Sequence, residues 1–437
     1  MPLSPCLSIQ ELLLLLNILY FPVQTSSRAS STTLCMSPAD YDILYYAIRN
    51  SPALMQLQLI TASSEEEEGA ICAAFLNPSS NELIVAFRGT SRGEWLDNFL
   101  GGASTEARDR VSTRQQIRAL EWYRALTRLN YNWKDYDQEH GRKNYYVTVT
   151  GHSKGGNKAK YITILEDSVD RCVSFNGQGF SDEFMEWYYP RIALRRDIVE
   201  NHNTEYDYVN PLLNDFGKTF YYKNQIADKG FLAGHCANAF FRFEEDGTCT
   251  MEASAHGQPE EIKELNLFLN RCLRSMSERK RIDLVQWMGI QAQAQADGVP
   301  WELRLTWLLA EENLDSLAYL MAYAMGYGDV YPEFCEVITK AAVLFKMEDM
   351  DKTLKAVKGM LQWKYFTVFL NMGTVVGNLI PERFWNMLEE YLENKYNLLV
   401  TRELLYGLVR LACKVSANLK RQTLYKKQNG IPRRKNK

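Results

Sequence analysis

The sequence has no cysteine pattern of the kind that a disulfide framework or a zinc site requires. Its nine cysteines are scattered from Cys6 to Cys413, without a CxxC or CxH pairing. An odd number of unpatterned cysteines is typical of a protein in a reducing compartment. We therefore expect a cytoplasmic protein with no metal ion and no other cofactor.

The chain also has no apolar run long enough to cross a membrane, which takes about 20 residues. Its strongest apolar segment, residues 8–21, has five leucines in a row, but it contains Glu11 and Asn17 and no Lys or Arg precedes it. These interruptions favour an N-terminal helix docked on the core. Export, with this segment as a secretion signal, is the alternative.

Neither sign of charge is in large excess: the chain has 50 Lys and Arg residues and 53 Asp and Glu residues, and its net charge is -3. A near-neutral total gives no overall field that would attract nucleic acid or an anionic membrane, and we expect no specific nucleic-acid binding. Residues 420–437 nevertheless hold eight basic and no acidic side chains. We interpret them as a solvated, disordered tail, with contact to acidic lipid or RNA as the alternative.

With 437 residues, 46% of them hydrophobic, the chain is large enough for more than one domain. Short apolar runs lie at residues 83–87, 145–150 and 171–175. Helical stretches separate them, at residues 115–129 and from Gly156 onward. Strands that alternate with helices predict a parallel sheet covered on both faces.

The pattern changes after this alternation. Two β-prone runs joined by Asp246-Gly247 predict an antiparallel hairpin at the sheet edge, and helical spacing from Ile262 to Met276 predicts a closing helix. Beyond about Arg279 we expect only helices, which are a candidate surface for a protein partner. We divide the chain into an N-terminal helix and polar connector (1–39), an α/β domain (40–278), an all-helical domain (279–419) and the basic tail (420–437).

A glycine-rich turn follows the strand predicted at residues 145–150. Its sequence is Gly151-His152-Ser153-Lys154-Gly155-Gly156, and a predicted helix comes next. This context is that of a nucleophile elbow, where the serine occupies a strained turn and the glycines leave room for the helix to cross the strand. We predict Ser153 as a nucleophile and the backbone N–H of Lys154 as a donor to a developing oxyanion.

Four segments together carry a resemblance to a known group: AFRGT, the Trp-bearing residues 93–97, GHSKGG and SFNGQGF. They resemble the class 3 lipases of the α/β-hydrolase fold, and within that group the bacterial Mbeg-like domain family of unknown function. The resemblance covers about Asp40 to Leu273. It implies a mostly parallel, lipase-like α/β-hydrolase sheet, followed here by an all-α region. It also implies Thr90 as the second oxyanion donor, through its N–H and its hydroxyl; the alternative for Thr90 is a strand-ending turn residue.

A serine nucleophile needs a histidine to take its proton, and in this fold the chain order is Ser, Asp or Glu, then His. Of the three histidines after Ser153, His202 stands in a polar run and is interpreted as a surface loop residue. His235 precedes the predicted hairpin, where the Mbeg-like pattern also has a histidine, and is our candidate. His256 is the fallback candidate for the base, and its alternative interpretation is a solvated loop residue.

Asp207 is the candidate acid because it lies in an aromatic and apolar stretch followed by a proline. This segment resembles the acid-bearing turn of class 3 lipases, although many Mbeg-like sequences have a serine there. Its role would be to orient the histidine. Asp197, Glu205 and Asp215 compete with it, and each is interpreted as a surface charge.

Two features near the turn have open interpretations. Lys154 replaces the leucine or glutamine common in class 3 lipases; its ammonium either extends to solvent or selects an anionic acyl or phosphate-bearing substrate. The apolar segment from Trp95 to Leu100, with Gly101-Gly102 after it, is either a lid with a glycine hinge or a helix packed on the sheet.

The favoured function is a serine hydrolase that cleaves a small-molecule or lipid carboxylic ester through an acyl-enzyme. The alternative is a catalytically weak hydrolase-fold scaffold that senses a ligand or binds a protein.

Overall fold

The computed structural model of the protein consists of two compact units, Met1–Leu273 and Arg274–Lys437. It describes residues 6–19, 38–63, 71–90, 94–102, 111–126, 136–137, 142–143, 145–226, 234–244, 248–300, 303–304, 307, 309–328, 358–359, 361–362, 382–396 and 402–428. The division between the units falls at the end of helix α9 (Glu260–Arg274), a few residues before the predicted boundary at 278/279. The predicted segment boundaries stay predictions.

The first unit is built around a seven-stranded sheet in the order β1-β2-β3-β6-β7-β8-β9. From β3 to β9 each strand runs parallel to its neighbours, whereas β1, β2 and β3 pair antiparallel. This confirms the predicted α/β architecture, a mostly parallel sheet flanked by helices. The strands of this sheet are β1 (Gln58–Ala62), β2 (Cys72–Asn77), β3 (Glu82–Phe87), β6 (Tyr146–His152), β7 (Arg171–Phe175), β8 (Val199–Thr204) and β9 (Lys218–Tyr222). Two short strands of two residues each, β4 (Tyr136–Asp137) and β5 (Arg142–Lys143), pair with each other before β6.

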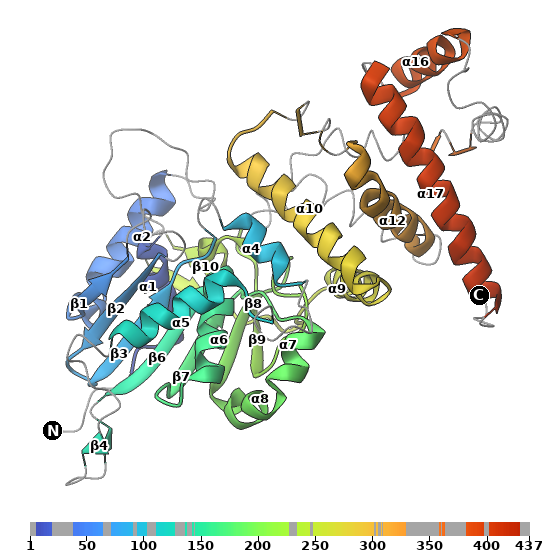
Figure 1. Cartoon of the computed structure of the whole chain (residues 1–437). Coiled ribbons are helices and arrows are strands. Elements are labelled where there is room, and N and C mark those ends of the chain that lie inside the picture. Colours follow the sequence, from blue (N-terminus) through green and yellow to red (C-terminus); the bar gives the residue numbers. More distant parts are fainter. Residues whose placement is uncertain are drawn as a thin grey trace. The chain divides into compact units, whose positions relative to one another are not determined.

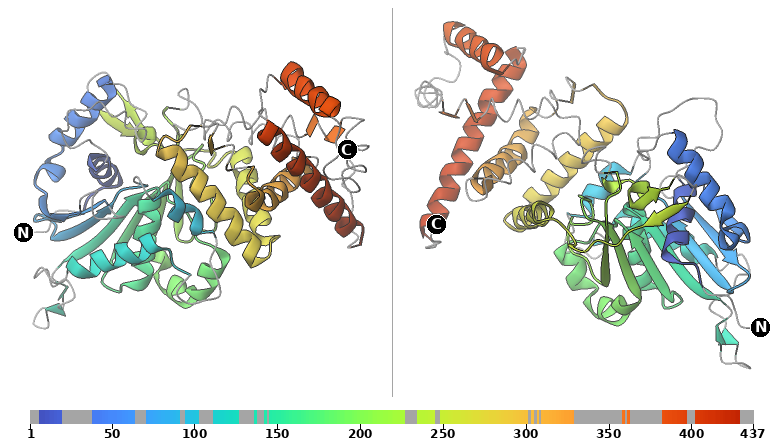
Figure 2. Two further views of the ribbon diagram at one scale, coloured as in Figure 1. Left: turned by 45° about the horizontal axis from the view of Figure 1, so that its top comes forward. Right: turned by 180° about the vertical axis from the view of Figure 1, so that it is seen from behind.

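The sheet has a hydrophobic core on each face. Along β3, Leu83, Val85 and Phe87 belong to one core, and Ile84 and Ala86 belong to the other, as the two-residue period of a strand dictates. The first face is covered by α5 (Arg114–Leu126), α6 (Lys154–Leu165), α7 (Asp182–Trp187) and α8 (Tyr189–Arg195) (Figure 1). The second is covered by α1 (Ile9–Ile18), α2 (Pro38–Asn50), α3 (Pro52–Met55) and the hairpin of β10 (Phe241–Phe243) and β11 (Cys249–Met251), seen from behind in Figure 2.

Helix α1 is the leucine-rich segment near the start of the chain, and it docks on the core as expected. A capping box of Ser8 and Glu11 begins it. All five leucines from Leu12 to Leu16 are buried against the second face of the sheet. Among the described residues, no helix combines the length and the apolar character that crossing a membrane requires.

Some predicted elements differ from the structure. The β10–β11 hairpin forms a sheet of its own, linked to β9 by one bridge between Tyr222 and Ala253, so it is not an edge of the main sheet. Strands β1, β2, β8 and β9 were not predicted. Helix α6 begins at Lys154, two residues before the predicted start. The predicted turn at Asp246-Gly247 lies outside the described residues, as do residues 20–37 of the predicted N-terminal helix and connector segment.

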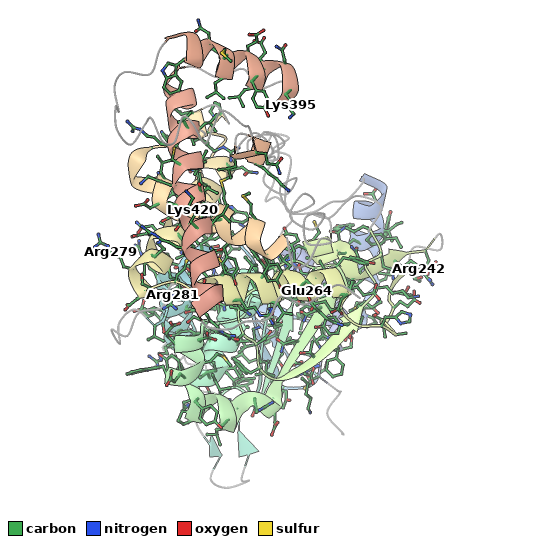
Figure 3. All side chains as sticks on the ribbon, turned by 90° about the vertical axis from the view of Figure 1, so that its right-hand side faces the viewer. Arg242, Glu264, Arg279, Arg281, Lys395 and Lys420 are labelled. Carbon is green, nitrogen blue, oxygen red and sulfur yellow. The ribbon has the colours of Figure 1, made fainter. Side chains whose placement is uncertain are left out.

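The described part of the second unit contains helices and no strand, which confirms the predicted all-helical region. Its helices are α10 (Glu278–Ala296), α12 (Glu311–Gly328), α16 (Glu382–Tyr396) and α17 (Arg402–Gln428). Helix α12 packs along α17, and Figure 3 shows Lys420 on α17. The expectation of a disordered tail is therefore wrong for residues 420–428, which continue the helix because lysine, arginine, leucine and glutamine are good helix formers. Residues 429–437 lie outside the described ranges.

The packing of α1 predicts a difference between two leucines. Leu13 in α1 is 0% exposed and Leu194 in α8 is 70% exposed. We expect Leu13→Ala to lower the free energy of unfolding by about 2–5 kcal/mol because it leaves a cavity, and Leu194→Ala to change it by less than about 0.5 kcal/mol. Urea denaturation followed by tryptophan fluorescence measures both, and equal losses would contradict the docking of α1.

Candidate active site

Ser153 is the single residue between the end of β6 and the start of α6. Its backbone has φ 60° and ψ -125°, a left-handed conformation that costs a non-glycine residue about 1–3 kcal/mol. The turn is held by the Ser153 N–H, which donates to the carbonyl of Phe175 in β7 at 2.9 Å. The strand-turn-helix geometry of a nucleophile elbow is thus present at the predicted serine.

The three glycines of the turn lie where no other side chain fits. A Cβ added at Gly151 would lie 2.2 Å from the Gly155 carbonyl, and one at Gly155 would lie 2.1 Å from the Phe87 carbonyl oxygen. One at Gly156 would lie 2.4 Å from the Ser174 hydroxyl. Because Gly155 touches the end of β3, the segment that follows β3 begins directly beside the elbow.

The structure brings Ser153, Asp207 and His235 into one hydrogen-bonded chain. His235 Nε2 lies 2.7 Å from Ser153 Oγ, and His235 Nδ1 lies 2.6 Å from Asp207 Oδ1. Ser153 is 7% exposed, the His235 side chain is 16% exposed, and Asp207 is fully buried at 0%. An aspartate that accepts from Nδ1–H leaves Nε2 without a proton, so Nε2 can accept from the serine hydroxyl.

Asp207 is a buried carboxylate whose oxygens are all engaged. Oδ1 accepts from the Val209 N–H at 3.2 Å besides His235, and Oδ2 accepts from the Asn210 N–H at 2.7 Å. A buried charge is tolerated when such bonds replace water. The turn after β8 therefore holds the Asp207 carboxylate in place.

Polar groups of neighbouring elements fix the backbone around His235. The Thr204 hydroxyl donates to the Gly234 carbonyl at 2.7 Å, and Asn176 Oδ1 accepts from the Thr204 N–H at 2.8 Å. The carbonyl of His235 itself lies 2.8 Å from Nε2 of His152, whose ring packs on the His235 ring. Burial, reinforced by the adjacent His235, lowers the pKa of His152 well below its usual value, so His152 is neutral and donates this bond. The supporting roles of Thr204, Asn176 and His152 were not predicted, because the sequence does not show which distant residue a polar side chain will contact.

The other two histidines that follow Ser153, His202 and His256, have different surroundings. His202 is buried in β8 and hydrogen-bonds the Tyr222 hydroxyl at 2.8 Å, so its interpretation as a surface loop residue was wrong. Its ring stacks on Phe220. The aromatic contacts to Phe220 and Tyr222 could not be inferred from the polar residues that surround His202 in the sequence. His256 is exposed, as expected of a loop residue.

The competing acids have other surroundings. Asp197 is exposed, which agrees with a surface charge. Glu205 accepts a hydrogen bond from the Ser254 hydroxyl. Asp215 is exposed, which agrees with a surface charge, and it also binds the buried ammonium of Lys160 through both carboxylate oxygens at 2.8 Å.

Both interpretations of the Lys154 side chain were wrong. It is 1% exposed, and its Nζ lies 2.9 Å from Oδ2 of Asp97, so the ammonium neither extends to solvent nor is free to bind an anion. Burial alone would raise the pKa of Asp97, but the Lys154 charge and the hydrogen bond from Thr113 outweigh it and hold that pKa below its usual value.

Thr90 follows β3, close to the elbow, and its hydroxyl oxygen accepts from Asn98 Nδ2 at 2.7 Å. Asn98 belongs to α4 (Trp95–Leu100), and its carbonyl accepts from Gln178 Nε2 at 2.9 Å. These bonds, with the Asp97–Lys154 ion pair, favour a packed helix over a lid for this segment. Within the described ranges, no three His, Cys, Asp or Glu side chains gather as they would around a metal ion.

Comparison with known proteins finds a matching family model and matching chains of known structure. Residues 53–199 match the model of the Mbeg1-like family, which confirms the resemblance over that part of the chain. This range contains Ser153 and ends before Asp207 and His235. A lipase of known structure, Lip2 from Yarrowia lipolytica, is similar at 13% identity and a TM-score of 0.30, over 38% of this chain and 67% of that chain. The curated proteins include no match.

Buried neutral histidines predict that stability falls in acid. Burial lowers the pKa of both His152 and His202, the latter against the opposing charge of Glu200. An unfolded histidine takes up its proton near pH 6.5 and the native one does so only at lower pH, so stability is lost as pH falls below about 6.5. Each such histidine contributes a slope of up to about 1.4 kcal/mol per pH unit.

Urea denaturation between pH 7.5 and pH 5 measures that slope. We expect His202→Gln to reduce it, and His256→Gln, at an exposed position, to leave it unchanged. A slope that is the same in His202→Gln as in wild type would contradict the neutral state of His202.

Proposed function

We propose that the protein is a serine hydrolase that cleaves a carboxylic ester through an acyl-enzyme on Ser153. The observation that carries this proposal is the pair of hydrogen bonds through His235, at 2.7 Å to Ser153 and 2.6 Å to Asp207. A serine hydroxyl at its ordinary pKa is a poor nucleophile, and a base within hydrogen-bond distance is the feature that activates it. The elbow geometry at Ser153 supports the same role.

The proton moves along this chain in both halves of the reaction. As Ser153 Oγ attacks the ester carbonyl, His235 Nε2 takes its proton and then gives it to the leaving alcohol. In the second half, His235 takes a proton from water, the hydroxide attacks the acyl-enzyme, and Nε2 returns the proton to Ser153. Asp207 stays ionised throughout, holds Nδ1–H and stabilises the imidazolium.

The negative charge that develops on the carbonyl oxygen needs donors. Lys154 follows the nucleophile and is the first residue of α6, so its backbone N–H is aligned with the positive end of the helix dipole. Thr90, after β3, is the second proposed donor. Removing one such donor from an esterase or protease typically costs about 10²–10³-fold in kcat.

The remaining assignments are broader. The substrate is a small-molecule or lipid ester, and the helical unit Arg274–Lys437 is a candidate site for a protein partner. Seven of the nine cysteines lie among the described residues and none of these seven forms a disulfide, which supports a cytoplasmic location. Burial raises the pKa of Cys172 and Cys272 to about 12, so these two thiols stay protonated and unreactive.

A fluorophosphonate probe tests the nucleophile. We expect wild type to be labelled, Ser153→Ala to show no label and His235→Gln to label far more slowly, because the serine then lacks its base. His202→Gln is the matched control, since His202 is buried but does not contact Ser153. Absence of labelling in folded wild type would instead support a scaffold without catalysis.

Hydrolysis of p-nitrophenyl esters of short and long acyl chains tests turnover. We expect Ser153→Ala and His235→Ala each to lower kcat/KM by on the order of 10⁴-fold or more, and the double variant to lose little further, because the residues act as a unit. Rates for wild type that equal the buffer rate at every chain length would contradict esterase activity.

A further inference from the structure

Helix α6 carries an uncommon set of charges. Every residue from Lys154 to Ile164 is buried, and three of them are lysines: Lys154, Lys158 and Lys160. Lysine is almost never fully buried unless it is paired with an opposite charge. Each of the three ammonium groups lies within 2.9 Å of a carboxylate oxygen.

Two of these pairs join α6 to the segment of α4. Lys154 pairs with Asp97 at 2.9 Å, and Lys158, one helical turn further on, pairs with Glu94 at 2.6 Å. Positions four apart on one helix and three apart on the other lie on the same face. The two pairs therefore form parallel links between the same two segments.

The position of Lys154 is electrostatically costly. It is the first residue of α6, where the helix dipole is positive and an ammonium is unfavourable, and the first turn of α6 has no acidic residue of its own. Asp97 supplies the missing negative charge from α4. Its carboxylate is fixed independently, because it accepts from the Thr113 hydroxyl at 2.7 Å and from the Gln115 N–H at 3.1 Å.

We propose that Asp97 is a positioning residue for the hydrolysis: by holding the buried Lys154 side chain, it fixes the residue whose backbone N–H stabilises the oxyanion. The inference rests on the proposed hydrolase function. Without Asp97, the Lys154 ammonium would be buried and unpaired, a state that typically costs about 3–5 kcal/mol. The side chain would have to leave its site, and the adjacent N–H would move with it.

The Lys158–Glu94 pair provides a control that distinguishes an effect on the oxyanion donor from an effect on folding stability alone. It joins the same two segments, and its side chains are 0% and 1% exposed. It lies a turn further from Ser153 and adjoins no proposed oxyanion donor. A variant that breaks this pair disturbs the same packing without touching the elbow.

The experiment compares Asp97→Asn with Glu94→Gln in the full-length protein, by melting temperature and by ester hydrolysis below both melting temperatures. We expect both variants to lose thermal stability. Only Asp97→Asn is expected to lose kcat, by between about tenfold and 10²-fold with KM little changed, the upper figure being the loss of one complete donor. Adding Lys154→Met to Asp97→Asn removes the unpaired ammonium and should recover most of the kcat.

Thr113→Val keeps the test available if Asp97→Asn does not fold. It removes one hydrogen bond to Asp97 and leaves the charge in place, so we expect a smaller loss of the same kind. The positioning role would be overturned if Asp97→Asn and Glu94→Gln lost kcat equally, or if Asp97→Asn kept the kcat of the wild type. In either case, ester hydrolysis by the wild type would still uphold the proposed function. If wild type shows neither fluorophosphonate labelling nor turnover, the proposed function fails and the positioning role fails with it.

Discussion

The crossing of α6 over the carboxyl ends of β3 and β6 leaves less room than a methyl group needs. At Gly151, Gly155 and Gly156 an added Cβ would come within 2.4 Å of another group, so the helix approaches the sheet as closely as backbone allows. The chain reaches that position only by turning within one residue, which forces Ser153 into its left-handed conformation. The serine is thus presented above the sheet by packing, before any hydrogen bond to His235 is considered.

The same close approach explains the charges around α6. A helix packed this tightly has no side facing water, so its lysines need carboxylates from elsewhere in the fold. They come from the α4 segment, with Glu94 and Asp97, and from Asp215 before β9. The polar interior is therefore a consequence of the crossing, and it links the elbow to elements distant in sequence.

The sequence predicts what depends on local pattern. The runs at 83–87, 145–150 and 171–175 are strands in the structure because each is apolar enough to be buried on both faces. Ser153, Asp207 and His235 were selected by a motif, a flanking proline and the chain order, and the structure brings them together. The family match covers only the first of the three.

What the sequence does not predict depends on distant partners. Strand β8 is rich in polar residues, yet Asn201 is buried and donates to the Phe216 carbonyl at 2.8 Å, and His202 binds Tyr222. A polar side chain is judged exposed unless its partner is known, which is why β8, the His202 environment and the Lys154 pair were misjudged. The support of His235 by Thr204 was missed for the same reason.

The second face of the sheet joins the beginning of the first unit to its end. Helix α1 packs with η6 (Ala237–Phe240) and the hairpin, and Gln10 Nε2 donates to the carbonyl of Cys249, 239 positions later. At a synthesis rate of about 5–20 residues per second, these partners are synthesised on the order of ten seconds or more after the leucines of α1. His235 lies two residues before η6, so it also leaves the ribosome only after α1, β6 and Ser153 have been synthesised.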